Sequence, residues 1–115
     1  MATDEPGKTI RLVCKISHSV DEKGYSPTSG DNLLTVTFLD EGKATIRKQG
    51  LGAQFVASIS KEMIVGHTIW GGDLQVKESI SINRFTGSFE NNIQAKGKAG
   101  LIFFGTCSLA SRQLF

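Results

Sequence analysis

Apolar and polar residues alternate along most of this chain with a period of two, as they do in half-buried β-strands. The clearest example covers residues 9–17, where Ile10, Leu12 and Cys14 fall on one face and Arg11 falls on the other. One face of such a strand packs into an apolar interior while the other meets solvent. The first alternating segment therefore predicts β-structure.

Further segments show the same alternation, and nothing has the apolar spacing of a long amphipathic helix. Most connections between them are short and contain Gly, Asp or Asn, which suits tight turns between antiparallel strands. Closing such a series into a barrel removes the exposed edge strands. We therefore predict an all-β domain of about eight antiparallel strands that form an up-and-down, calycin-like barrel, with a β-sandwich as the alternative. The predicted strands cover residues 9–17, 33–39, 44–48, 54–60, 62–70, 75–83, 88–94 and 99–109.

Two segments lie outside this pattern. Residues 1–7 are predicted to be a flexible N-terminal tail, which leaves residues 8–115 as a single domain. Residues 18–32 are polar and rich in turn-forming residues, and they are predicted to form a long loop. A loop of that length inside a compact domain is uncommon and is usually functional or mobile. It carries Tyr25, the only tyrosine of the chain, as a candidate contact for a protein partner.

Charge and composition narrow the classes of partner. The 115 residues include 13 Lys and Arg and 11 Asp and Glu, interspersed, for a net charge of +2. This balance, without a basic face, argues against a nucleic-acid partner. No segment approaches the roughly 20 apolar residues of a membrane-spanning helix. Residues 1–7 lack the apolar core of a signal peptide, so two locations stay open: cytoplasmic, or periplasmic or secreted if an export signal was removed.

The two cysteines lie in the first and the last predicted strand. Cys14 and Cys107 both fall on the apolar face of their strand. The first and last strands of a closed meander are neighbours, so the two thiols can meet. A bridge would close nearly the whole chain into one loop, worth about 4–5 kcal/mol in the chain-entropy treatment. The alternative is two buried free thiols that act as small apolar side chains.

The C-terminal third of the chain contains a turn motif and a strand motif. Residues 80–87 read Ile-Ser-Ile-Asn-Arg-Phe-Thr-Gly, residues 105–107 read Gly-Thr-Cys, and the chain ends at Phe115. Together with Cys14, these segments resemble the C-terminal pattern of small uncharacterised proteobacterial β-proteins. The resemblance implies no known reaction. Because such proteins often look exported, it favours a disulfide bridge.

The residue types of the turn motif also predict what each residue does in the turn. Asn and Gly tolerate a positive φ, so Asn83 and Gly87 are predicted to turn the chain between two strands. Arg84 is predicted to fix this turn by placing its guanidinium on a carboxylate or on carbonyl oxygens. Contact of Arg84 with a ligand is the alternative.

Motifs with catalytic or metal chemistry are absent or misplaced. Residues 58–61 match a Ser-x-x-Lys pattern, but that chemistry needs a helix and this segment lies between predicted strands. The histidines, His18 and His67, lack zinc-site spacing. His18 could bind a metal weakly with Asp21 and Glu22, although a solvated loop explains these residues equally well. We therefore expect no enzyme activity, no metal site and no cofactor.

Four residues are candidates for a ligand site inside the barrel. By alternation Glu78 shares a face with its apolar neighbours, and a lone buried carboxylate is costly unless it is paired. His67 and Asn91 also alternate with apolar residues, and Trp70 ends the same strand as His67. If these faces line the interior, the polar groups form a small ligand patch. The alternatives are a β-bulge that turns Glu78 to solvent, or a satisfied hydrogen bond within the core.

Two functions follow from these patterns. The first is a binding module in which the barrel holds a small apolar or amphipathic ligand and the 18–32 loop covers its mouth. The alternative is a protein-interaction or inhibitor module that uses the 18–32 loop and Tyr25. The partner itself stays unknown at this point.

Overall fold

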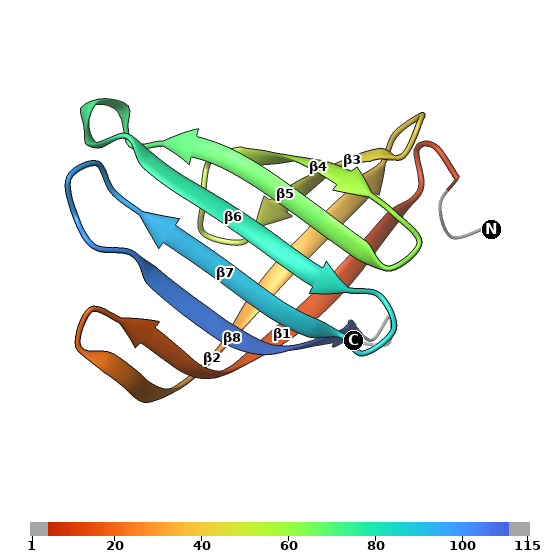
Figure 1. Cartoon of the computed structure of the whole chain (residues 1–115). Coiled ribbons are helices and arrows are strands. Elements are labelled where there is room, and N and C mark those ends of the chain that lie inside the picture. The colour runs from red at the N-terminus through yellow and green to blue at the C-terminus, as the bar shows by residue number, and fades with distance from the viewer. Residues whose placement is uncertain (1–4, 111–115) are drawn as a thin grey trace.

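The computed structural model describes residues 5–110 of the 115-residue chain, and in it eight antiparallel strands form a closed barrel (Figure 1). A short 3₁₀ turn, η2 (Gly72–Leu74), lies between the fifth and sixth strands. The strands are β1 (Thr9–Asp21), β2 (Gly24–Phe38), β3 (Lys43–Lys48), β4 (Gln54–Ile59), β5 (Met63–Trp70), β6 (Val76–Asn83), β7 (Ser88–Gln94) and β8 (Leu101–Leu109).

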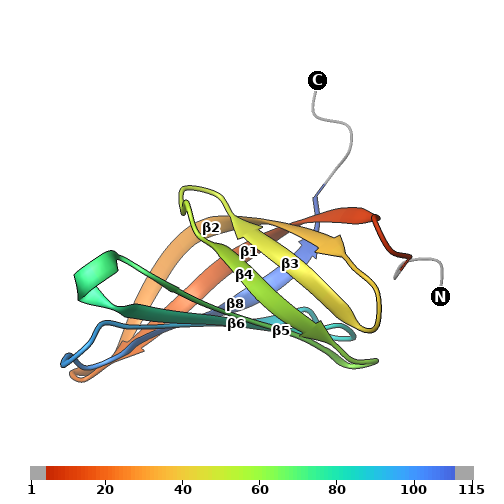
Figure 2. The same cartoon turned by 90° about the horizontal axis from the view of Figure 1, so that it is seen from above.

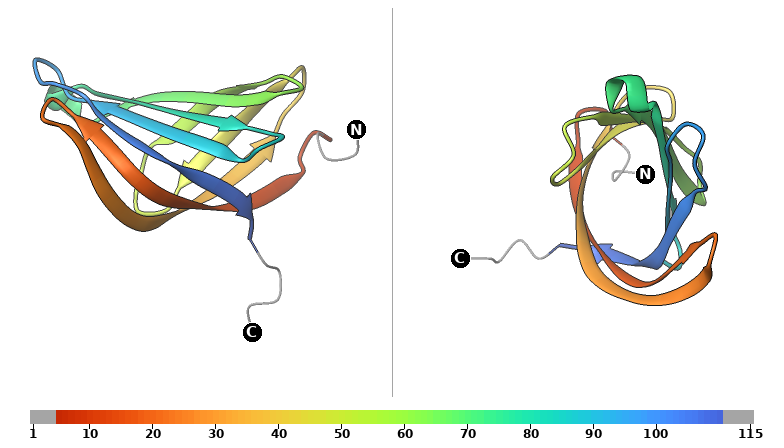
Figure 3. Two further views of the ribbon diagram at one scale, coloured as in Figure 1. Left: turned by 60° about the horizontal axis from the view of Figure 1, so that its bottom comes forward. Right: turned by 90° about the vertical axis from the view of Figure 1, so that its left-hand side faces the viewer.

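Each strand pairs with the next along the chain, and β8 pairs with β1 to close the ring. The end-on view in Figure 3 shows this ring directly. The predicted all-β, eight-stranded antiparallel barrel is confirmed, and the sandwich alternative is wrong. Alternation was sufficient here because each strand has one face in a single interior.

The apolar core lies toward one end of the barrel. We call this the apolar end; it carries the β2–β3, β4–β5 and β6–β7 connections. Alternate positions of each strand point inward, as in β6, where every second residue is buried. Burial of these side chains is the main force that holds the strands together. The buried core comprises Leu12, Cys14, Leu34, Val36, Phe38, Ala44, Ile46, Phe55, Ala57, Ile64, Ile80, Ile82, Phe89 and Cys107.

The opposite end, which we call the polar end, carries the β1–β2, β3–β4, β5–β6 and β7–β8 connections. Its wall is uneven, because β3 and β4 have 6 residues each while β1 has 13 and β2 has 15. Figures 1 and 2 show the β3–β4 connection stopping well short of the other three. The remaining strands therefore extend beyond β3 and β4 as a curved wall.

The prediction that residues 18–32 form a long loop is wrong, because these residues form a β-hairpin. Residues 18–21 continue β1, residues 24–32 begin β2, and a two-residue turn joins the strands, with Asp21 opposite Gly24. The hydroxyls of Ser19 and Thr28 lie 2.9 Å apart across this hairpin. The segment looked like a loop because its residues are polar on both faces, and because a register shift between Ile16 and His18 interrupts the alternation.

The barrel closes where β1 meets β8. A register shift opposite Gly105 brings the two backbones close together. A Cβ at Gly105 would overlap the carbonyl oxygen of Lys15 and lie 3.0 Å from the Cα of Ile16. Cys14 and Cys107 are opposite each other across this seam and form a disulfide. The bridge is therefore present, and the free-thiol alternative is wrong.

The β6–β7 turn also contacts this seam. The carboxamide oxygen of Asn83 accepts hydrogen bonds from the N–H groups of Phe85 and Thr86, at 2.9 Å each, as predicted for a turn-forming Asn. Gly87 has φ of +80°, and its carbonyl accepts from the N–H of Cys107 at 2.7 Å. Arg84 donates to the Ser60 carbonyl at 2.8 Å, which confirms the prediction that it fixes the turn.

The chain termini are only partly described. Of the predicted tail at residues 1–7, residues 1–4 lie outside the described part of the chain, as does Phe115. Residues 5–8 form a turn in which Lys8 N–H donates to Glu5 O at 3.0 Å. Gly7 N–H donates to Phe38 O at 2.7 Å, so this part of the segment is tied to β2.

Candidate functional site: a polar cluster across the barrel

Glu78 points into the barrel, as its alternation with apolar residues predicts. It lies on β6 opposite Thr68 of β5 and Ile93 of β7, and the whole residue is only 2% exposed. The β-bulge alternative is therefore wrong. A carboxylate buried to this extent needs partners that replace its lost hydration.

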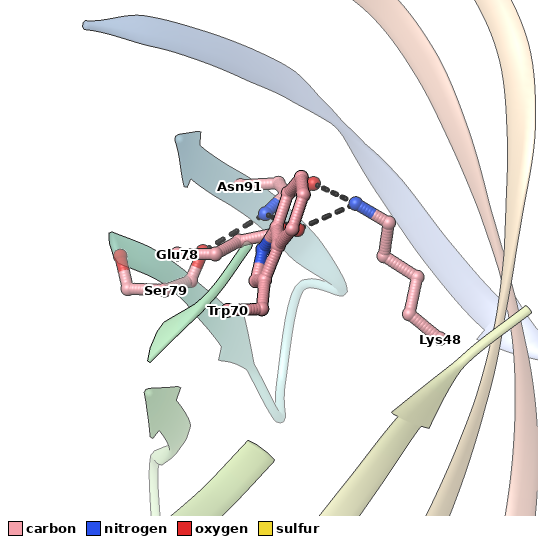
Figure 4. A network of polar contacts seen from close by, with 5 residues as sticks. All are labelled: Lys48, Trp70, Glu78, Ser79 and Asn91. Atoms are coloured by element: carbon pink, nitrogen blue, oxygen red, sulfur yellow. Dashed lines mark hydrogen bonds and ion pairs between the residues drawn. The ribbon is translucent and has the colours of Figure 1, made fainter. Parts of the chain in front are cut away.

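Three side chains supply those partners (Figure 4). Lys48 Nζ lies 2.5 Å from Glu78 Oε2, and Asn91 Nδ2 donates to the same oxygen at 2.9 Å. Trp70 Nε1 donates to Oε1 at 2.9 Å. Asn91 in turn accepts from Lys48 Nζ at 3.0 Å and donates to the Ser79 carbonyl at 3.0 Å. We call Lys48, Trp70, Glu78 and Asn91 the polar cluster.

The cluster crosses the interior of the barrel. Lys48 is the last residue of β3, whereas Glu78 and Asn91 lie on β6 and β7. Figure 4 shows the lysine chain reaching from β3 toward those strands. Within the described residues no buried side-chain nitrogen or oxygen lacks a hydrogen-bond partner. The cluster thus links the short strand β3 to β5, β6 and β7, which belong to the longer wall of the polar end. We call the inner face of β5, β6, β7 and β8 at this end the long wall.

Lys48 is the functional candidate that the sequence reading missed. It lies in register with the inward-facing Ala44 and Ile46 of β3, so the alternation did carry the signal. A lysine at the end of a strand is ordinarily solvated, which is why it was not counted. Lys48 is instead held inside the barrel by its contact with the Glu78 carboxylate. The side chain of Lys48 is only 15% exposed, and that of Glu78 is 1% exposed.

Three of the four predicted ligand-site residues meet in this cluster, and His67 does not. Trp70 and Asn91 each donate a hydrogen bond to the Glu78 carboxylate. His67 is exposed because its face of β5 is the outer one, opposite to the face that carries Trp70. The prediction that His67 converges with Glu78 inside the barrel is therefore wrong. Both faces of β5 contain apolar residues, so alternation alone could not tell inside from outside.

His67 instead lines an outer groove of about 310 Å³ over β5, β6 and β7, whose lining also includes Ile69, Lys77, Ser79, Asn92 and Gln94. This groove lies on the outside of the barrel wall, behind the polar cluster. It offers one imidazole, the ammonium of Lys77 and several uncharged polar groups to solvent. Ser79 lies opposite His67 across the β5–β6 ladder, so the two side chains share this outer face.

The long wall is apolar but not fully buried. Strand register places Phe103 opposite the buried Asn91, and Leu101 opposite Ile93. All these positions therefore point inward. Trp70, Ile93, Leu101 and Phe103 are nevertheless only half-buried, in contrast to the core below them. The polar end thus presents partly exposed apolar side chains beside the polar cluster.

His18 and Tyr25 lie on the outside of the β1–β2 hairpin. The imidazole of His18 stacks on Phe104 with ring centroids 4.8 Å apart, and lies 5.1 Å from the ring of Tyr25. Tyr25 is 66% exposed. Residues 5–110 contain no group of three or more His, Cys, Asp or Glu placed to hold a metal ion, so His18 does not form one with Asp21 and Glu22.

Comparisons with known proteins assign this chain to no family. No family model matches the chain, and no curated protein and no solved structure matches it. In the described residues, no helix has the length and apolar character required to cross a membrane. The geometry of the barrel and of its polar end is therefore the basis for assigning a function.

Proposed function

We propose that this chain is a calycin-like binding barrel that takes a small amphipathic molecule at its polar end. The observation that carries the proposal is the set of inward-facing residues Trp70, Ile93, Leu101 and Phe103, which are half-buried although they point into the barrel. Partly exposed apolar side chains on an inward-facing wall, next to a few placed polar groups, are typical of ligand sites.

The polar cluster supports the same proposal. A buried ion pair is weak as a source of stability, since apolar residues of similar volume often do as well. Here Glu78 of the Lys48–Glu78 pair lies opposite Ile93 of the apolar wall in the β6–β7 ladder. Such a pair orients the polar group of a bound molecule while the wall covers its apolar part.

The test is a ligand screen with a matched pair of variants. Thermal shift and native mass spectrometry with neutral and charged amphiphiles identify binders, and Leu101→Ser then removes an inner apolar contact. We expect this variant to weaken binding about tenfold, the effect of one lost apolar contact of this size. The control is Ile69→Ser, which changes an outer side chain that is 66% exposed.

Two outcomes contradict the proposal. If no amphiphile raises the melting temperature of the protein, and none stays bound to it in native mass spectrometry, the barrel does not bind this class of molecule. If Ile69→Ser weakens binding and Leu101→Ser does not, the ligand occupies the outer groove that Ile69 lines.

A second candidate function is protein recognition through the β1–β2 hairpin. β3 pairs with residues 34–38 of β2, and Gln49 N–H donates to the Leu33 carbonyl, so residues 24–32 are paired with β1 alone. An unpaired edge of this kind can accept a strand of a partner. Tyr25 projects from the same segment and is 66% exposed.

The hairpin proposal is tested by comparing pull-downs with two single variants. Tyr25→Ser removes the exposed ring on the hairpin, and Phe85→Ser removes a ring that is 70% exposed at the opposite end of the barrel. We expect partner recovery to fall with Tyr25→Ser and to stay unchanged with Phe85→Ser. Equal recovery with both variants would exclude a role for the hairpin.

The disulfide supports an exported location for the binding barrel. Bridges such as Cys14–Cys107 persist in oxidising compartments and are rare where thiols are kept reduced. The resemblance to proteobacterial proteins that often look exported points the same way. A periplasmic or secreted protein is therefore our proposal, and fractionation of the native host checks it.

A further inference from the structure

The polar cluster leaves one hydrogen-bond donor available. Both oxygens of the Glu78 carboxylate accept hydrogen bonds from the cluster. The carboxamide of Asn91 both accepts and donates within it. The ammonium of Lys48 carries three protons but has two acceptors among the described residues, Glu78 and Asn91. The site therefore offers one N–H donor to a ligand, in addition to the groups that hold the cluster together.

The charge of the cluster selects between kinds of acceptor. Lys48 and Glu78 cancel each other, and Asn91 and Trp70 are uncharged. The strand positions that point inward at this end include one further charged residue within residues 5–110, the exposed Asp21 at the rim. A ligand carboxylate on Lys48 would lie beside Glu78, so two anions would share one cation away from bulk water. A neutral acceptor brings no such repulsion.

The remaining surface fits an apolar body. Trp70, Ile93, Leu101 and Phe103 form the wall beside the cluster, and all four are half-buried without a covering element. Resting on the binding function above, we infer that the ligand is an uncharged amphipathic molecule. Its alcohol, ketone, ester or amide oxygen accepts from Lys48 Nζ, and its apolar part covers this wall; the corresponding acids are excluded.

The experiment compares decanol with decanoate, which share a chain length and differ in the charge of the headgroup. Trp70 is the only tryptophan of the chain, so its fluorescence reports binding directly at the cluster. Near neutral pH and below the micellar range, we expect decanol to bind the wild-type protein at least about tenfold more tightly than decanoate, because of the repulsion from Glu78.

A charge variant sharpens the comparison. Glu78→Gln keeps the size of the side chain and an oxygen for Trp70, but it leaves Lys48 with an uncompensated positive charge. We expect this variant to reverse the preference, so that decanoate binds more tightly than decanol. The wild-type comparison stands by itself if the variant does not fold.

The outcomes separate this inference from the binding function. If wild-type protein binds decanoate as tightly as decanol, the selection for neutral ligands is wrong while binding at the polar end stands. Retention of the decanol preference by folded Glu78→Gln has the same meaning. If neither probe binds either protein, and the wider amphiphile screen also fails, both proposals are overturned.

Discussion

The two ends of this barrel are built from the same alternation but are held together differently. At the apolar end, inward positions carry apolar side chains, and the seam beside them is fixed by the Cys14–Cys107 bridge and by the close approach at Gly105. At the polar end, inward positions carry a lysine, a glutamate and an asparagine that hold each other by hydrogen bonds. The backbone plan is therefore common to both ends, and the residue types at inward positions set what each end can do.

The comparison also separates stability from function. Buried apolar area and a covalent bridge stabilise a fold without offering anything to a ligand. Hydrogen bonds and charge placed beside uncovered apolar groups add less stability but can select a partner. We therefore expect changes at the apolar end to reduce stability strongly, and changes at the polar end to have smaller effects on stability.

The largest effect is expected from the disulfide. Cys14 and Cys107 are separated by 93 positions, so reducing the bridge restores the conformational freedom of nearly the whole chain in the unfolded state. The chain-entropy treatment predicts a loss of about 4.5 kcal/mol in the free energy of unfolding. Denaturant unfolding with and without reductant measures this loss.

The control for reduction is a Cys14→Ala and Cys107→Ala double variant, which should unfold at the same denaturant concentration with or without reductant. An oxidised wild-type protein that is no more stable than its reduced form would show that the bridge does not constrain the chain.

The next largest effect is expected from the close approach of β8 to β1. A Cβ added by Gly105→Ala would overlap the carbonyl oxygen of Lys15, a backbone atom that cannot move without disturbing the β1–β8 ladder. We expect a loss of about 3 kcal/mol, at the upper end of the usual range for overpacking. Thermal or denaturant unfolding of the oxidised protein measures it.

Gly100→Ala is the matched control for this change. A Cβ there lies 3.7 Å from its nearest neighbour, which is an ordinary contact. The control should therefore unfold close to the wild type. If Gly105→Ala unfolds there too, β8 has room at the seam and the observed register shift has no steric role.

Most of the fold could be predicted from the sequence, because one face of nearly every strand is apolar. The alternation around Cys14 and Cys107 placed both residues inside, and the antiparallel order made their strands neighbours. The β1–β2 hairpin could not be predicted in the same way. Its residues are mostly polar, and its β1 arm is ordered by pairing with β8, as between Val20 and Ile102, which depends on the closed ring.

The candidate site was predictable in part. Alternation among apolar neighbours identified Glu78 and Asn91, and both are buried in the polar cluster. It misplaced His67, because apolar residues occur on both faces of β5. It passed over Lys48, because a lysine is expected inside a barrel only once its carboxylate partner is known, and that partner lies three strands away in the barrel.

The smallest of these effects on stability is expected from the polar cluster itself, and it is measured by a double-mutant cycle. Lys48→Met leaves the buried Glu78 carboxylate without its cation, and we expect a loss of about 2 kcal/mol, reduced from the fully buried case because Lys48 is 15% exposed. Glu78→Gln keeps the hydrogen-bonding shape, and we expect a loss of about 1 kcal/mol. The double variant should lose about 2 kcal/mol rather than 3, because either change alone already breaks the ion pair.

The control for this cycle is Arg47→Met, which removes a neighbouring outward-facing cation and should change stability by less than about 0.5 kcal/mol. Additive losses in the double variant would mean that Lys48 and Glu78 do not interact in solution, and the polar cluster on which the proposed ligand selection depends would then not exist.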